Sequence, residues 1–229
     1  MFQWHLGFCR PGLLPTSRGF QHHTGFWGGS QDYYTHTSHH AYDFRSDRRV
    51  FRTKRYSTDI FRDRAVQIIR VGGEYPGKIH LLVLQGHDST QPMLLYLPFQ
   101  APHEPLQVNV TYATFCVIHG GVGQVPAGFR SLYRRVRDRQ RATYLGMVTA
   151  LDAAVGRVVR ALHRAAMWDN TILVFLSDNG GGVHRSGSNW PLRGSKHSLF
   201  EGGTRVPAFI AGPGLASRVE NRGEQFRTE

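Results

Sequence analysis

The chain has 229 residues, of which 40% are apolar, so it can bury a sizeable core and does not have the composition of a disordered protein. Lysine and arginine number 28 against 16 aspartate and glutamate, and the net charge of +12 attracts phosphate, sulfate or anionic polysaccharide through a general field. No zinc-finger, homeodomain or RNA-recognition pattern accompanies the charge, and no run reaches the roughly 18 apolar residues of a membrane span, so neither nucleic acid nor a membrane is an expected partner.

The N-terminal half of the chain is predicted to contain one helix and one buried strand between loops. Residues 1–50 are rich in Gly, His, Tyr and Arg without periodicity, so they are expected to form mainly loops, with a short strand near residues 4–8. Residues 57–70 favour an amphipathic helix capped by Ser57 or Thr58, and its apolar face consists of Ile60, Phe61, Ala65, Ile68 and Ile69. The apolar run at 93–99 is typical of a strand covered on both faces.

The C-terminal half shows a helix followed closely by a strand. Residues 141–168 carry apolar side chains at helical spacing, namely Leu145, Val148, Leu151, Val155, Val158, Val159 and Leu162. Asp169 and Asn170 break that pattern, and an apolar strand is predicted at 171–176. A further strand is expected at 204–212, where Pro207 would make it an edge strand or a bulged one. This order indicates an α/β fold with a mostly parallel sheet flanked by helices.

Two glycine-rich stretches, 71–86 and 109–129, do not fit this plan. They are interpreted either as surface insertions or as segments translated from introns. Residues 216–229 are polar enough to form a frayed tail. The two cysteines, Cys9 and Cys116, are too few for a disulfide framework and lack the spacing of a metal knuckle.

Asp178 and Asn179 follow directly on the predicted strand 171–176. Ligands collect outside the carboxyl ends of strands in open α/β sheets, and carboxylate and amide oxygens are ligands that Ca²⁺ or Mg²⁺ takes. The glycines at 180–182 would let the backbone approach such a ligand closely. The alternative is an ordinary turn, because Asp, Asn and Gly are common turn residues. A divalent site also needs more oxygen ligands than this pair supplies.

The stretch "NWPLRGSKHSLFEGGTRVP" at 189–207 continues this motif and carries a family resemblance. Together with "DNGG", "WHLGF", "SQDYYTH", "LYLPFQAPHEPLQV" and "YLGMVTALDAAVG", in this order along the chain, it resembles the type I sulfatases. The similarity is closest to the arylsulfatase B group, which includes the N-acetylgalactosamine-4-sulfatases. The resemblance implies an alkaline-phosphatase-like fold that is cut at both ends here, with a partial catalytic domain at 1–215.

The resemblance implies a role for each matching residue. Asp178 and Asn179 match ligands of an active-site Ca²⁺ that neutralises sulfate oxygens, and Lys196 matches a lysine that touches the sulfate and the leaving oxygen. His103 matches a histidine near the substrate sulfate, suited to hydrogen bonding or proton transfer, and His5 matches one that supports the nucleophile. Three further residues in the matched block are expected to be structural: Arg193 and Glu201 to brace the loop, and Trp190 to pack.

The sequence also departs from the family pattern. The family nucleophile is a formylglycine made from the cysteine of a CxPSR stretch, and a pair of aspartates near it supplies the other Ca²⁺ ligands. Both precede "WHLG" in the family, and neither occurs in these 229 residues. Cys9, in "CRPGL", lies on the wrong side of "WHLG" and is not assigned as the nucleophile precursor. Gln3 stands where the family has a lysine that contacts sulfate, and a neutral amide supplies no positive charge.

The sequence therefore predicts a sulfuric ester hydrolase of the arylsulfatase B type, acting with Ca²⁺ on sulfate esters such as those of glycosaminoglycan sugars, in a form expected to be catalytically impaired. The alternative is a non-catalytic fragment or a basic module that binds sulfated polysaccharide. Phosphate transfer, the chemistry of the related phosphatases, is disfavoured by the "NWPLRG" block and its lysine. The family implies a lysosomal or secreted enzyme that degrades glycosaminoglycan, and the sequon at Asn109 fits that route, although residues 1–12 show no signal peptide.

Overall fold

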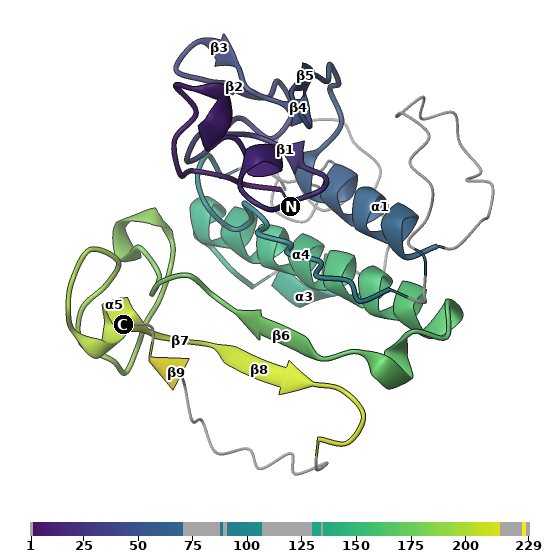
Figure 1. The fold of residues 1–229 in the computed structure, drawn as a ribbon. Helices are drawn as coiled ribbons and strands as arrows, with labels where there is room; N and C mark the ends of the chain where they lie inside the picture. Colours follow the sequence, from purple (N-terminus) through teal and green to yellow (C-terminus); the bar gives the residue numbers. More distant parts are fainter. Residues whose placement is uncertain are drawn as a thin grey trace. The chain divides into compact units, whose positions relative to one another are not determined.

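The computed structural model describes residues 2–70, 88, 91–106, 130–133, 135–215 and 226–227. The stretches 71–86 and 109–129, with Asn109 and Cys116, lie outside these residues, so their interpretation as insertions stays a prediction. The chain divides into two compact units, Met1–Ala165 and Ala166–Glu229, which are called unit 1 and unit 2 below. Figure 1 shows the elements of each unit.

The N-terminal part of unit 1 consists of loops with very short strands, as its composition predicts. Two 3₁₀ turns, η1 (Pro11–Leu13) and η2 (Pro15–Ser17), come first. An antiparallel sheet has the order β1-β4-β5 (Thr24–Gly25, Arg45–Ser46 and Arg49–Val50), and β2 (Thr37–Ser38) pairs with β3 (Ala41–Tyr42). The strand predicted near residues 4–8 does not form in the structure. The chain instead makes a single bridge between Gln3 and Phe26 and then turns away.

Two helices form the rest of unit 1 and pack side by side, with the short α3 (Arg130–Tyr133) before the second (Figure 1). The first, α1, spans Ser57–Ile69, close to its predicted bounds. Its N-cap is Tyr56 rather than Ser57 or Thr58, and no side chain caps it. Ser57 is buried, and its backbone N–H donates to the oxygen of Tyr33 at 3.0 Å, so tertiary contacts satisfy this donor where a side-chain cap was predicted.

The second helix, α4, spans Arg139–Arg164 and begins at Asp138, whose carboxylate accepts hydrogen bonds from the N–H groups of Gln140 and Arg141. It ends earlier than the predicted 168, because Ala166 takes a positive φ of 53°. Its buried face also differs from the prediction, since most of the large apolar residues are only partly buried. Small residues dominate the buried set, which consists of Ala142, Gly146, Met147, Ala150, Ala154, Val158, Ala161 and Leu162. Small side chains allow a neighbouring segment to approach the helix closely.

Aromatic rings form the centre of unit 1. Phe61 of α1 stacks on Phe2 with ring centroids 4.4 Å apart, and it also contacts Phe26, Phe44 and Phe99. Offset and edge contacts of this kind add to the free energy of burying the rings. The N-terminal segment, the strand region 24–50, helix α1 and the segment before His103 therefore share one core.

Unit 2 contains the predicted strand–loop–strand sequence. A 3₁₀ turn, η3 (Trp168–Asn170), leads into β6 (Leu173–Leu176), and a long loop with η4 (Val183–Arg185) and α5 (Glu201–Thr204) follows. Two strands then follow, β7 (Arg205–Val206) and β8 (Ala208–Ala211), with Pro207 between them, as expected for a proline that interrupts a strand. β6 pairs with β8, and β7 pairs with β9 (Phe226–Arg227).

The strand pairs differ from a mostly parallel sheet. Each named pair among the described residues is antiparallel, and the parallel contact is the Gln3–Phe26 bridge. The strand predicted at 93–99 does not form. Leu94 is 83% exposed and Tyr96 50% exposed, while the alternate residues Met93, Leu95 and Leu97 are partly buried. The segment thus has the alternating burial of a strand, but no strand of the described residues pairs with it, and a strand exists only through its pairing.

Candidate active site

The loop after β6 holds the predicted metal ligands. Asp178 is exposed, and its carboxylate makes no hydrogen bond or ion pair with other residues that the structure describes. The side-chain nitrogen of Asn179 donates to the oxygen of Gly180 at 3.0 Å. The amide oxygen of Asn179 therefore remains an available acceptor beside the carboxylate of Asp178. Two hard oxygen donors without internal partners fit a Ca²⁺ ion in their chemistry.

Close backbone packing fixes the position of this loop. The N–H of Gly180 donates to the oxygen of Gly203 at 2.8 Å, and a Cβ at residue 180 would lie 1.9 Å from the oxygen of Gly202. The glycine at 180 is therefore needed for approach to another backbone segment. The sequence interpretation, which assigned the glycine run to ligand approach, missed this packing role.

Asn189 connects three parts of the same loop, and sequence analysis gave it no role. Its amide oxygen accepts from the N–H of Gly181 at 2.7 Å, and its amide nitrogen donates to the oxygens of Gly181 and Gly194. An asparagine can make such a two-sided bridge because its amide carries both a donor and an acceptor. Its place at the start of the matched block was the signal available in the sequence.

Lys196 lies in the loop region that Asn189 organises. Its backbone N–H donates to the oxygen of Gly181 at 3.3 Å, and Gly181 stands two residues after Asn179 in the sequence. The side chain is partly buried, and its ammonium group has no carboxylate partner among the described residues. The structure thus brings Asp178, Asn179 and Lys196 onto one hydrogen-bonded loop of unit 2.

The structural roles expected in this block are confirmed for two residues and wrong for the third. The guanidinium of Arg193 lies 3.9 Å from the ring centroid of Phe200, and Glu201 pairs with Arg205 at 3.6 Å. Both contacts brace the loop. Trp190, which was expected to pack, is 88% exposed, and the neighbouring Asn189 makes the hydrogen bonds that hold this turn.

In unit 1, His5 extends from a short loop anchored to residues 26–29. Its backbone N–H donates to the oxygen of Trp27 at 3.1 Å, and its φ of 50° turns the chain outward, so the residue is exposed. The imidazole lies against Gly29, where an added Cβ would come within 2.6 Å of the ring. Gln3 donates from its side-chain nitrogen to the oxygen of Gly29 at 2.7 Å. Gln3 therefore supports the His5 loop in this chain.

His103 is exposed on a second loop of unit 1. Its Nδ1 lies 2.9 Å from the oxygen of Glu104, and a carbonyl oxygen can only accept, so Nδ1 is the donor and Nε2 takes no part in this hydrogen bond. The backbone oxygen of His103 accepts from the Tyr33 hydroxyl at 2.9 Å. Burial raises the pKa of Tyr33 well above its usual value, so this hydroxyl remains a donor.

A buried polar network holds the His103 loop to the rest of unit 1. Gln100 donates to the oxygen of Gln31 at 2.6 Å, and Gln31 donates to the hydroxyl of Ser57 at 3.3 Å. The Ser57 hydroxyl in turn donates to the oxygen of Tyr33 at 3.1 Å. The motifs "SQDYYTH" and "LPFQAPHE", which are far apart in sequence, are thus joined through the start of α1.

The site residues therefore fall into two groups. Asp178, Asn179 and Lys196 share a loop of unit 2, while His5 and His103 extend from the aromatic core of unit 1 on separate loops, with no hydrogen bond or ring contact between them in the described part of the chain. The described residues contain no cluster of three or more His, Cys, Asp or Glu suited to a metal ion. Among them, too, no helix is long and apolar enough to cross a membrane.

Comparisons with known proteins identify the family of this chain. The sulfatase family model matches residues 1–228. Arylsulfatase J of Mus musculus is 34% identical over 224 residues, which cover 94% of this chain and 32% of that protein. N-acetylgalactosamine-6-sulfatase of Canis lupus familiaris is 24% identical over 231 residues, covering 96% of this chain and 38% of that protein.

Solved structures show the same fold. The crystal structure of Ps i-CgsB in complex with k-i-k-neocarrahexaose is 28% identical, with a TM-score of 0.72, and the match covers 93% of this chain and 44% of that one. The sulfatase yidJ from Bacteroides fragilis matches with a TM-score of 0.57 at 18% identity over 90% of this chain and 40% of that one, which supports the fold alone.

The fold is therefore the alkaline-phosphatase-like fold of the sulfatases, and the chain spans less than half the length of these solved structures. This chain belongs to the sulfatase family, whose members hydrolyse sulfate esters. It spans about a third of the length of Arylsulfatase J, the relative named above.

Proposed function

We propose that this chain is part of an arylsulfatase B-type sulfatase that hydrolyses sulfate esters with Ca²⁺, and that residues 1–215 belong to its catalytic domain. Support comes from the family match over residues 1–228 and from the order of the sulfatase-like motifs along the chain. The relatives named arylsulfatase and N-acetylgalactosamine-6-sulfatase support the same class of reaction.

The arrangement of the loop after β6 is the observation that carries this proposal. Asp178 and Asn179 leave a carboxylate and an amide oxygen without internal partners, and the backbone of Lys196 is hydrogen-bonded to the same loop. An unpaired carboxylate, an amide oxygen and an unpaired ammonium on one loop form a site for a cation and an anion together. A purely structural turn would not need the ammonium.

Each residue has a chemical task in this proposal. A bound Ca²⁺ would be held in part by Asp178 and Asn179 and would neutralise negative charge on sulfate oxygens. The Lys196 ammonium would stabilise the charge that develops on the leaving oxygen. His103 would accept or return a proton through Nε2, and His5 would orient the nucleophile.

The nucleophile itself lies outside these residues in the proposal. The 229 residues contain no CxPSR stretch and no second pair of Ca²⁺ ligands matching the family pattern. Gln3 also donates its amide to Gly29 and contributes no positive charge toward a sulfate group. We therefore expect weak Ca²⁺ binding and no turnover from the 229-residue chain alone.

Sulfated sugars are the substrate class we propose. One relative is named for N-acetylgalactosamine 6-sulfate chemistry, and one structural neighbour was solved with k-i-k-neocarrahexaose. We accordingly propose a role in glycosaminoglycan degradation in the lysosome or outside the cell. The arylsulfatase B type, rather than another sulfatase type, rests on the motif resemblance.

Calorimetric titration of Ca²⁺ into the 229-residue chain tests the site. We expect binding in the millimolar range and a loss of at least tenfold in affinity in the Asp178→Asn variant, because the variant replaces a charged ligand with a neutral one. Asp169→Asn is the matched control, since Asp169 is also exposed and lies in unit 2.

Hydrolysis of 4-nitrophenyl sulfate is measured alongside. Equal Ca²⁺ affinity in Asp178→Asn and Asp169→Asn would contradict the proposed metal site. Turnover by the 229-residue chain alone would show that the nucleophile has been misassigned and would return attention to Cys9, which is exposed and carries a free thiol.

A further inference from the structure

The segment from Asp43 to Arg55 concentrates positive charge at one end of unit 1. It contains six lysine and arginine residues against two aspartates, and the antiparallel strands β4 and β5 fold its first half into a hairpin (Figure 1). Five of the cations form what we call the basic hairpin surface: Arg45, Arg48, Arg49, Arg52 and Lys54.

Both aspartates of the segment are used inside the fold. The carboxylate of Asp43 accepts from the backbone N–H groups of Trp27 and Gly28, the latter at 2.8 Å. The carboxylate of Asp47 accepts from the N–H of His23 at 2.8 Å, and its other oxygen lies 3.9 Å from His22. Neither forms an ion pair with a cation of the basic hairpin surface.

Three of the five cations have neutral partners instead. The guanidinium of Arg45 lies 5.0 Å from the Trp27 ring centroid, and that of Arg52 lies 5.1 Å from the Tyr42 ring centroid. Arg48 donates to the hydroxyl of Ser17 at 2.7 Å. These contacts restrict the side chains without neutralising their charge.

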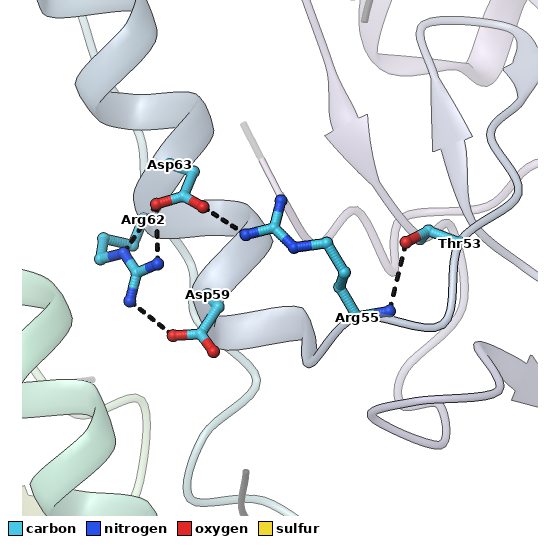
Figure 2. A network of polar contacts seen from close by, with 5 residues as sticks. All are labelled: Thr53, Arg55, Asp59, Arg62 and Asp63. Carbon is cyan, nitrogen blue, oxygen red and sulfur yellow. Dashed lines mark hydrogen bonds and ion pairs between the residues drawn. The ribbon is translucent and has the colours of Figure 1, made fainter. Parts of the chain in front are cut away.

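Neighbouring arginines show the opposite arrangement. Arg55 pairs with Asp63, and Arg62 pairs with Asp59 and Asp63 at the start of α1 (Figure 2). In contrast, Arg49, Arg52 and Lys54 are exposed and have no carboxylate partner among the described residues. The fold thus compensates one set of cations and leaves the adjacent set available for an external anion.

We propose that the basic hairpin surface binds an extended sulfated polysaccharide, in addition to any binding at the hydrolytic site. Guanidinium groups present two parallel N–H donors to an oxyanion, and several of them on one short segment match a repeated anion better than a single small one. Single-stranded nucleic acid fits less well, because it needs open aromatic faces for base stacking and the rings of Trp27 and Tyr42 lie under arginines.

The surface also adjoins the loop of His5. The backbone oxygen of Trp27 accepts from the N–H of His5, and the ring of the same Trp27 lies under Arg45. A polysaccharide on the surface would therefore end beside His5, and this part of the inference rests on the proposed function. Binding itself needs neither Ca²⁺ nor a nucleophile, so it can be measured separately.

The test is the affinity of the 229-residue chain for heparin as a function of salt concentration. In the triple variant Arg49→Gln, Arg52→Gln and Lys54→Gln we expect the affinity to fall at least tenfold. Each cation that contacts the polyanion releases bound counterions, so the slope of log Kd against log salt should fall by about 2 to 3. The matched control is Arg157→Gln, Arg160→Gln and Arg164→Gln, which removes the same charge from exposed positions of α4.

We expect the control to change the affinity less than about threefold. Equal losses in the two triple variants would mean that heparin responds to net charge alone, and would overturn the proposal. Far-UV circular dichroism at 222 nm checks that both variants keep their helices. Heparin affinity is measured on the triple variants in Ca²⁺-free buffer and Ca²⁺ affinity on Asp178→Asn, so a failed metal site and a failed basic surface give different results.

A second measurement needs no variant. Heparin bound to the wild-type chain should protect Arg49 and Arg52 from phenylglyoxal more than it protects Arg157 and Arg160. Equal protection at the two places would contradict the proposal. Single-stranded poly-dT of the same charge is expected to bind more weakly, and equally tight binding with the same protection would show that the surface does not select a sulfated polysaccharide.

Discussion

The two units hold their functional loops in different ways. In unit 1, His5 and His103 extend from segments whose large aromatic side chains are buried against one another, such as Phe2, Phe26 and Phe61. In unit 2, Val206 is the one buried apolar side chain among the described residues, and the loop of Asp178 is fixed by backbone contacts at glycines. Removing side-chain atoms should therefore lower the stability of unit 1. Adding side-chain atoms at the glycines should instead loosen the loop of unit 2.

The exposed apolar residues of unit 2 are consistent with this difference. Val174 of β6 and Ile210 of β8 face each other across the strand pair, and they are 58% and 49% exposed. The burial of such side chains is the main favourable contribution to the stability of a domain. The described part of unit 2 thus derives more of its order from hydrogen bonds than from a core.

The largest expected effect is that of Phe61→Ala in unit 1. The ring of Phe61 contacts four other aromatic rings and is fully buried. Its removal should lower the free energy of unfolding by about 3 to 5 kcal/mol. Urea denaturation followed at 222 nm measures this change, because α1 and α4 both belong to unit 1.

Leu199→Ala is the control for this loss, since Leu199 lies in unit 2 and is 97% exposed. We expect its unfolding midpoint to match that of the wild type. If the two variants had equal midpoints, the aromatic rings would not be the core that stabilises unit 1.

A smaller effect is expected from Gly202→Ala in unit 2. The new Cβ would lie 2.3 Å from the backbone oxygen of Gly194, so the two segments would have to separate at a cost of about 1 to 3 kcal/mol. The readout is amide hydrogen exchange at Gly180, whose N–H is bonded to the oxygen of Gly203. Its protection should fall about tenfold or more.

Gly182→Ala is the matched control in the same loop. A Cβ at residue 182 would meet only the side chain of Arg185, at 3.6 Å, which is an ordinary contact. Protection at Gly180 should therefore stay within about twofold of the wild type. Equal loss in both variants would mean that the loop responds to any added methyl group and that the close approach at Gly202 is not special.

These features also show what the sequence could predict. Apolar periodicity placed α1, α4 and β6 within a few residues of their ends, because it depends only on which face of an element is buried. The carboxylate–amide pair at the end of β6 was visible for the same reason. It followed a recognisable element, so its position in the fold could be inferred.

Contacts between distant segments were beyond such patterns. Three such contacts join side chains to backbone groups that only folding brings together. They are the hydrogen bond from Gln3 to Gly29, the bridge made by Asn189, and the bonds that the carboxylate of Asp43 accepts. The parallel sheet was inferred from one helix and the strand that follows it, but strand direction is decided by neighbours that this inference did not include. The small residues on the buried face of α4 were missed because large apolar residues dominate a periodicity search.

The smallest expected effect is a dependence of the stability of unit 1 on pH. His23 and His36 of unit 1 are both fully buried, and burial lowers the pKa of His23 to about 3 and that of His36 to about 4. In the unfolded chain both titrate near 6.5. As pH falls below about 6.5, the unfolded state binds more protons than the folded state, so stability decreases, by up to about 1.4 kcal/mol per pH unit for each histidine. Between pH 6.5 and 5.5 we expect a loss of about 1 to 2 kcal/mol.

His23→Gln should reduce this slope, because glutamine does not titrate. His184→Gln, the same substitution at an exposed position of unit 2, is the matched control. Urea denaturation of the three proteins at several pH values between 7 and 5 measures the slopes. An unchanged slope in His23→Gln would show that this imidazole is not held neutral by burial. A reduced slope would mean that buried His23 makes unit 1 less stable under acidic conditions.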